Sequence, residues 1–131
     1  MILGEWNGNY RYLHNNGKYK VGKFTMDIFE FKNNDFLGII IDDTEYKGSS
    51  IKGYLIDKQV SFIKTYHSIE VKLENGQTIK SNKAHTIKYE GEIVSETEIY
   101  GTWFRQEQKI THNGTEYLIK PEQGSWSAKK N

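Results

Sequence analysis

This sequence predicts a single, nearly all-β domain, built as one antiparallel up-and-down barrel of about eight strands. Apolar and polar residues alternate along short segments throughout the chain, as expected for strands with one buried face. Turn-forming residues separate these segments at intervals of roughly 8–14 residues. No apolar repeat of helical period extends beyond about two turns, so we expect no long helix.

The expected strands follow one another along the chain with short connections. In the first strand Trp6, Tyr10 and Tyr12 share one face, and residues 14–17 (HNNG) form the turn that ends it. The last strand opens at 116–120 and continues through 124–127 after a break at Pro121, which cannot donate a ladder hydrogen bond. The strands between are expected at about residues 20–31, 36–41, 50–56, 59–67, 85–94 and 97–105.

Residues 69–80 stand between the fifth and sixth of these strands and carry Asn75-Gly76 at their centre. Asn-Gly favours a two-residue type I′ hairpin turn, since both residues accept positive φ. The segment is therefore either one long hairpin that joins two barrel strands or a separate flap.

We expect the sheet to close on itself. An open meander of about eight strands leaves two unpaired edges, and closing it into a barrel removes both. Glycines within the expected strands support this, because glycine permits the sharp bends of a small barrel. They are Gly8, Gly22, Gly38, Gly53, Gly91 and Gly101.

The composition limits the classes of function. The chain has 131 residues, which fits one domain over 1–131, and it contains no Cys, which excludes disulfides, thiolate metal sites and Cys nucleophiles. The net charge of +1 comes without a basic stripe, so we expect no nucleic-acid partner.

The sequence has neither a signal-peptide pattern at its start nor a long apolar run. We therefore expect a cytoplasmic protein without a membrane segment, with a trimmed signal peptide as the alternative, and a monomer or small homo-oligomer.

Three parts of the sequence resemble a known pattern. They are GEWNGNY at 4–10, IKG at 51–53 followed by VSFIKTY at 60–66, and IKYEG at 87–91 followed by IYGTW at 99–103. In this order they resemble the strands and hairpins of calycin barrels, in particular the uncharacterised lipocalin-like and avidin-like barrels of bacteria. The resemblance implies eight strands, a pocket at one mouth, and a basic side chain from a late strand that packs on Trp6. It does not extend to an avidin-type set of biotin contacts, or to the helix pair of fatty-acid-binding proteins.

Two cations, Lys64 and Arg105, alternate with apolar residues on strand faces that we expect to point inward. A buried charge needs a partner. One interpretation is an anionic ligand group bound by both, because the Arg fork binds carboxylates through two hydrogen bonds. The other is structural: Arg105 covers Trp6 through a cation–π contact, and Lys64 pairs with an internal acid such as Glu30.

Aromatic residues on the same faces would line such a pocket. Tyr10, Tyr12, Tyr66 and Tyr89 project from apolar faces and offer rings and hydroxyls to a ligand, or they are ordinary core residues. The predicted ligand-binding residues are Tyr10, Tyr12, Phe62, Lys64, Tyr66, Tyr89, Trp103 and Arg105.

The sequence contains no strong motif for a metal, a cofactor or catalysis, so we expect neither metal nor cofactor. The histidines lack metal-site spacing. His67 and His85 approach each other only if the segment between them folds back as a hairpin, and would then form a metal pair or a general base. Asp42 and Asp43 point opposite ways if they lie on a strand, and we expect a solvated loop there. Phosphate-loop, dinucleotide and G-x-S-x-G motifs are absent.

We expect this barrel to bind a small, partly apolar molecule of unknown identity, with an anionic group as the natural partner of the two cations. Two alternatives remain open, because a fold does not decide a function. One is a lipocalin-fold enzyme of the isomerase or decarboxylase type, whose catalytic residues the sequence does not identify. The other is a protein-interaction module with a filled barrel.

Overall fold

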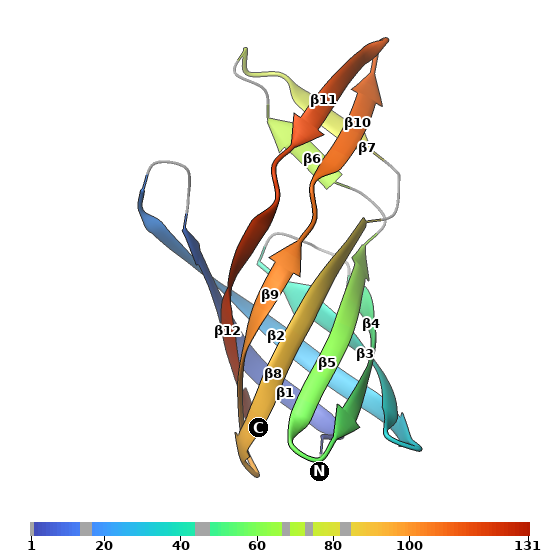
Figure 1. Ribbon diagram of the computed structural model, residues 1–131, viewed down its shortest axis with the longest axis vertical. Coiled ribbons are helices and arrows are strands. Elements are labelled where there is room, and N and C mark those ends of the chain that lie inside the picture. Colours follow the sequence, from blue (N-terminus) through green and yellow to red (C-terminus); the bar gives the residue numbers. More distant parts are fainter. Residues whose placement is uncertain (1, 14–16, 44–47, 67–68, 73–74, 82–84) are drawn as a thin grey trace.

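The computed structural model describes residues 2–13, 17–43, 48–66, 69–72, 75–81 and 85–131. Every regular element in these residues is a strand, which confirms the expected all-β class. Eight strands form a closed antiparallel barrel (Figure 1). They are β1 (Gly4–Leu13), β2 (Tyr19–Lys32), β3 (Asp35–Asp42), β4 (Ser49–Ile56), β5 (Gln59–Tyr66), β8 (His85–Ser95), β9 (Glu98–Arg105) and β12 (Glu122–Lys130).

Each barrel strand pairs with the barrel strands that precede and follow it in the chain. The order around the barrel is β1-β12-β9-β8-β5-β4-β3-β2, and β1 closes the ring on β12 with Tyr10 opposite Trp126. This is the up-and-down topology that the alternation and the short turns predict. Closure pairs both edges of what would otherwise be an open sheet.

The connections between β2 and β3 and between β4 and β5 follow the chemistry of their residues. Asn33 and Asn34 have φ values of 53° and 71°, and Asp57 has a φ of 54°. Asn and Asp enter this left-handed conformation more readily than most residues, which explains the sharp turns at these positions. A β-bulge between Ile28 and Glu30 adds a local bend to β2.

Aromatic rings occupy the middle of the barrel. Phe62 and Tyr89 stack with their ring centroids 4.7 Å apart, and both meet Trp126 edge-on, at 5.6 and 5.9 Å. A Cβ atom on Gly101 would lie 2.6 Å from Nε1 of Trp126 and 1.9 Å from a backbone carbonyl oxygen. A mid-strand glycine therefore makes room for an aromatic side chain as well as for curvature.

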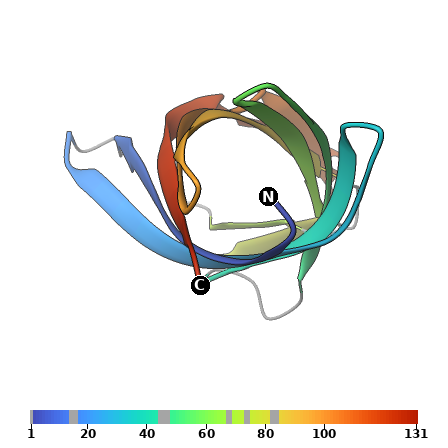
Figure 2. The same ribbon diagram turned by 90° about the horizontal axis from the view of Figure 1, so that it is seen from below.

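The N-terminal segment closes one end of the barrel, which we call the closed end. Figure 2 shows this segment inside the ring of strands. Ile2 is fully buried, and its carbonyl oxygen accepts a 2.8 Å hydrogen bond from Nε1 of Trp6, which is only 1% exposed. The Lys130 ammonium lies 5.7 Å from the centre of the Trp6 ring. The basic side chain from a late strand that the resemblance implies near Trp6 is thus present.

The choice of Arg105 as that cation was wrong. Trp6 lies opposite Lys130 at the end of β12, whereas Arg105 lies opposite Glu122 at the start of the same strand. Nearly the whole length of β12 therefore separates Arg105 from Trp6. Only the register of β12 against its two neighbours decides which cation reaches the indole.

Two additional hairpins extend from the opposite end of the barrel, which we call the hairpin end (Figure 1). One consists of β6 (Ile69–Lys72) and β7 (Thr78–Ser81), the other of β10 (Gln108–His112) and β11 (Thr115–Ile119). Segment 69–80 is thus a separate flap, one of the two forms that its sequence allowed.

The second hairpin corrects the expectation that residues 116–120 open the last barrel strand. Asn113 and Gly114, with φ values of 52° and 77°, turn the chain back so that β11 pairs with β10. Pro121 then interrupts the ladder, and the barrel strand begins at Glu122. Ile79 and Ile110 are 1% and 4% exposed, so each hairpin buries an aliphatic side chain away from the barrel core.

Candidate functional site

The barrel interior is polar at its hairpin end and apolar at its closed end. β1, β3, β5 and β9 end at the hairpin end, and β8 and β12 begin there (Figure 1). At the closed end the inward positions hold residues such as Ile2, Ile28 and Ile99. Inward positions near the hairpin end hold Tyr10, Tyr12, Asp42, Lys64, Trp103, Arg105 and Glu122.

β1 contributes two stacked tyrosines, Tyr10 and Tyr12, whose ring centroids lie 6.3 Å apart. The Tyr10 ring lies over Gly22 of β2, where an added Cβ would come within 2.0 Å of it. The Tyr10 hydroxyl donates a 2.6 Å hydrogen bond to Oδ1 of Asp43. Burial raises the pKa of Tyr10 well above its ordinary value, and the bond to Asp43 and the charge of that carboxylate raise it further. Tyr10 is therefore a neutral donor that is committed to Asp43.

Lys64 is a buried cation with its own counterion. Its side chain is 3% exposed, and its Nζ lies 2.5 Å from Oδ2 of Asp42, which is 11% exposed. The pair joins β5 to β3 across β4. A buried lysine is stable only when it is paired in this way. The expected internal acid for Lys64 exists, but it is Asp42 rather than Glu30, because Glu30 lies on an exposed position after the β2 bulge.

Trp103 presents an unsatisfied donor. Its side chain is 7% exposed, and its Nε1 has no hydrogen-bond partner among the described residues. The indole contacts the Tyr12 ring edge-on at 5.9 Å, and Gly124 of β12 makes room for it, since a Cβ there would lie 2.6 Å from Nε1. Buried donors without a partner are rare in proteins, and water, an ion or a bound molecule can satisfy such a donor.

Arg105, two residues further along β9, is only partly satisfied. Its Nη2 donates a 3.3 Å hydrogen bond to the Lys120 carbonyl and lies 3.6 Å from Oε1 of Glu122. Its Nε is buried and has no partner among the described residues. Burial, followed by the charges of Glu122 and Asp43, raises the pKa of Tyr12, and Arg105 opposes this shift.

Phe62 and Tyr89 lie deeper and belong to the aromatic core, with 1% and 6% of their surface exposed. Tyr66 lies opposite His85 in the register of β5 and β8. The Tyr66 side chain is outside the described residues, as is His67, and with it the predicted histidine pair. Of the eight predicted ligand-binding residues, the structure thus groups Tyr10, Tyr12 and Trp103 through ring contacts at the hairpin end, where Arg105 follows on β9. Lys64 is paired with Asp42, the neighbour of the Asp43 that binds Tyr10.

The expectation of a solvated loop at Asp42-Asp43 was wrong for Asp42, which ends β3 on its inward face with its side chain 11% exposed. Asp43 is exposed and follows the strand, as expected, and it accepts a hydrogen bond from the Tyr10 hydroxyl. Sequence reasoning also missed Glu122, which pairs with Arg105. Alternation would have found both acids: Asp42 continues the inward series of Phe36, Gly38 and Ile40, and Glu122 precedes Gly124 and Trp126 by even steps.

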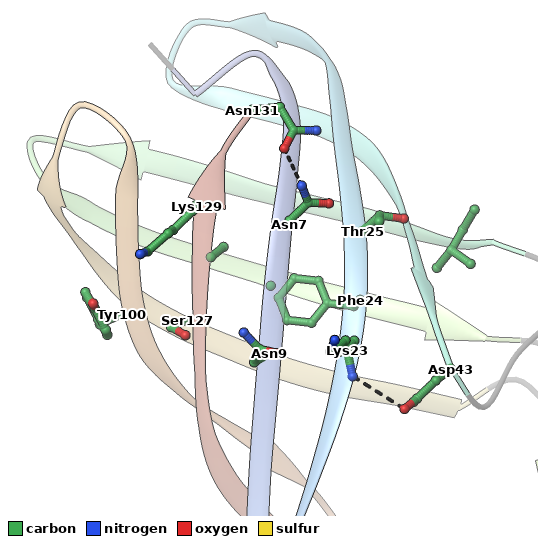
Figure 3. Close-up of a pocket in the computed structure, with 13 residues that line it drawn as sticks. Asn7, Asn9, Lys23, Phe24, Thr25, Asp43, Tyr100, Ser127, Lys129 and Asn131 are labelled. Carbon is green, nitrogen blue, oxygen red and sulfur yellow. Dashed lines mark hydrogen bonds between the residues drawn. The ribbon is translucent and has the colours of Figure 1, made fainter.

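A hollow lies on the outer wall, over β1, β2 and β12 (Figure 3). This hollow measures about 680 Å³, and the Phe24 ring forms part of its floor beside Gly8. Its polar groups bond to one another: Asn7 donates to Asn131, and the Lys23 amide donates a 3.4 Å bond to Asp43 (Figure 3). Neither Trp103 nor Arg105 lines it, but Asp43, which binds the Tyr10 hydroxyl, does.

No group of three His, Cys, Asp or Glu side chains in the described ranges is arranged to hold a metal ion. In the same part of the chain, no helix is long and apolar enough to cross a membrane.

The fold and its polar end define the class of the molecule: a closed, eight-stranded, antiparallel up-and-down β-barrel with ionised and aromatic side chains at one end of its interior. Comparison with protein-family models, curated proteins and solved structures finds no match. The chemistry of the hairpin end is therefore the basis on which a function can be assigned.

Proposed function

We propose that this chain is a non-enzymatic binding barrel of the lipocalin-like and avidin-like kind. Its ligand is a small, partly apolar molecule with an oxygen acceptor, best matched by a carboxylate, that enters at the hairpin end. The observation that carries this proposal is the pair of buried donors on β9, Trp103 Nε1 and Arg105 Nε, which have no partner among the described residues. A ligand oxygen that accepts from them would remove the cost of leaving two donors unsatisfied.

The surrounding side chains support an apolar body for the ligand. Tyr12 and Trp103 form an aromatic wall next to the two donors, and the partly buried Ile87 lies on β8 beside β9. Ligand sites in proteins commonly combine such apolar walls with a few polar groups that set orientation.

Arg105 is a better partner for an acidic ligand than Lys64. The Lys64–Asp42 pair is short and buried, so an incoming anion would have to displace Asp42 or share its cation. Glu122 is 39% exposed, lies 3.6 Å from Arg105 and occupies only the Nη2 side of the guanidinium. An arginine fork has five N–H donors, so it can hold Glu122 and a ligand carboxylate together.

A protein-interaction module is the second candidate, and the aromatic packing of Phe62, Tyr89 and Trp126 favours it, because these rings fill the middle of the barrel. In that case the hairpin end would hold ordered solvent rather than a ligand, and the chain would act through its outer surface. The enzyme alternative has less support, since Asp42 and Glu122 are each held by a cation and Asp43 by a tyrosine.

The test is titration with cis-parinaric acid, a fluorescent carboxylate with an apolar chain, and with its alcohol analogue. We expect the acid to bind more tightly than the alcohol, and Arg105→Met to weaken acid binding by about tenfold or more, as for loss of a charged hydrogen bond. Arg11→Met is the matched control, because Arg11 lies on the exterior, 3.9 Å above the Tyr19 ring. Native mass spectrometry of the protein from its own host would reveal a retained ligand.

Three results would overturn the proposal. The first is no binding of either probe by the unaltered chain. The second is equal binding by the Arg105→Met and Arg11→Met variants. The third is unfolding of Arg105→Met without a specific binding defect, which would make Arg105 a structural residue. Trp103→Phe, which keeps the ring character and removes the donor, provides a second variant if Arg105→Met folds poorly.

A further inference from the structure

The outer face of β3 is apolar, which is unusual for a strand that faces solvent. Its inward side chains include Phe36 and Ile40, and its outward ones are Leu37, Ile39 and Ile41, which are 37%, 44% and 45% exposed. A continuous apolar run of this kind is typical of strands covered on both faces. We call Leu37, Ile39 and Ile41 the β3 ridge.

The apolar surface continues on both sides of the ridge. Tyr54 on β4 and Ile63 on β5 are 45% and 47% exposed, and together with Leu37 they line a hollow of about 630 Å³ on the outer wall. On the other side, Phe29 projects from the bulge in β2 and is 58% exposed. By contrast, outward positions on β1 and β12 hold polar residues such as Asn7, Asn9, Ser125, Ser127 and Lys129.

Acidic side chains border the ridge on its β2 side, and a basic side chain borders it on its β4 side. Glu30 on β2 and Lys52 on β4 stand directly opposite Leu37 on its two sides, and Asp27 on β2 stands opposite Ile39. All three charged side chains are exposed. The β2 border of the ridge is thus acidic and the β4 border is basic.

We propose that this face binds a second copy of the chain, in a two-fold dimer whose axis runs parallel to β3 between the two barrels. This inference is independent of the ligand at the hairpin end. A two-fold axis in this direction places the β3 ridges of the two copies against each other and the β2 border of each copy against the β4 border of its partner. A surface that pairs with itself must be self-complementary, and this arrangement meets the condition.

Both the charges and the shape of this face favour this axis. It brings Glu30 of each copy opposite the other copy's lysine-bearing β4 border, so that unlike charges meet. It also brings Phe29 of each copy to the other copy's hollow, beside Leu37 and Tyr54. Aromatic side chains seated in pockets are common anchors of interfaces. An axis perpendicular to β3 would instead place the acidic borders of the two copies against each other.

The experiment is sedimentation equilibrium on the full chain from about 1 to 300 μM, a range that detects dissociation constants typical of weak and moderate dimers. We expect dimers, and we expect Phe29→Lys and Ile39→Lys to raise the dissociation constant by about tenfold or more. Val21→Lys is the matched control: Val21 also lies outward on β2 and is 67% exposed, but it stands away from the ridge. Circular dichroism confirms that each variant folds.

A charge exchange tests the axis itself. Glu30→Lys and Lys52→Glu should each weaken the dimer, and the double variant should restore it to within about threefold of the unaltered chain, because the unlike charges then meet again. A chain that stays monomeric over the whole range overturns the proposal. So does a Val21→Lys effect equal to that of Ile39→Lys, or a double variant that remains as weak as the single ones.

Discussion

Lys64 on β5 and Asp42 at the end of β3 form a 2.5 Å ion pair across β4, with side chains only 3% and 11% exposed. Removing Asp42 would leave a buried ammonium without a counterion. We expect Asp42→Ala to lower the free energy of unfolding by about 3 kcal/mol in urea denaturation. The control is Glu90→Ala, which breaks the exposed Lys88–Glu90 pair at 3.1 Å and should cost less than about 1 kcal/mol.

The double variant Asp42→Ala, Lys64→Met separates loss of the pair from loss of packing. If the cost arises from an uncompensated charge, the double variant should be more stable than Asp42→Ala alone. Equal losses in Asp42→Ala and Glu90→Ala would show that the Lys64–Asp42 pair is hydrated rather than buried.

Trp6 anchors the closed end. Its indole is 1% exposed and donates to the Ile2 carbonyl at 2.8 Å. Trp6→Ala should lower the free energy of unfolding by about 3–5 kcal/mol, as for other large truncations in cores. Lys130→Met keeps most of the aliphatic contact and removes the cation at 5.7 Å from the ring, so it should cost no more than about 1 kcal/mol. A loss below about 1 kcal/mol for Trp6→Ala would mean that the segment around Ile2 does not close the barrel.

The raised pKa of Tyr10 predicts that the folded state loses stability at alkaline pH. Its pKa is raised first by burial and then by Asp43, so the folded state holds the phenol proton more tightly than the unfolded state, where the pKa is near 10.0. The resulting stability is fully present below about pH 10 and is lost as the pH rises further, because the unfolded chain then releases the proton while the folded chain keeps it.

Tyr10→Phe tests this response. At pH 8 the variant should be less stable than the unaltered chain by about 1 kcal/mol, the usual value of one hydrogen bond. Between pH 10 and 11 the difference in unfolding free energy should shrink. Tyr54→Phe on the outer face serves as the control. A difference that stays constant up to pH 11 would indicate that the Tyr10 hydroxyl is hydrated rather than held by Asp43.

Gly101 tests the role of glycine in the core. A Cβ at this position would lie 1.9 Å from the Glu90 carbonyl oxygen and 2.6 Å from Nε1 of Trp126, and the first of these is backbone that cannot move aside easily. Gly101→Ala should cost about 1–3 kcal/mol or more and change the near-ultraviolet circular dichroism of the tryptophans. Ser125→Ala, on an exposed position of β12, should leave both unchanged. An unaffected Gly101→Ala spectrum would place Trp126 elsewhere.

Alternation within strands and the turn-forming residues predicted much of the architecture. The alternation around Phe62 and Lys64 placed both side chains in the interior, and Asn75-Gly76 marked a hairpin that the structure contains as β6 and β7. The final strand shows the limit of this reasoning. Residues 115–119 alternate like any other strand, but Asn113-Gly114 gives them β10 as a local partner, so they leave the barrel.

The sequence predicted several residues of the candidate site, but it did not predict which side chains pair with one another. Arg105 and Lys64 were identified as inward cations, yet their acids, Glu122 and Asp42, come from strands that are distant in sequence or two strands apart in the barrel. The cation over Trp6 was expected from a late strand, and Lys130 rather than Arg105 occupies that position.

Local pattern along the chain is enough to assign most strands, most turns and the inward side chains, because these depend on period-two alternation and on the φ preferences of Asn, Asp and Gly. The contacts between side chains of different strands follow from the tertiary structure alone. The partner of Arg105, Lys64 or Trp6 depends on the register of each strand against its neighbours and on the closure of β1 onto β12. A shift of two residues in that register would preserve every inward face and replace every partner, so alternation within a strand carries no information about it.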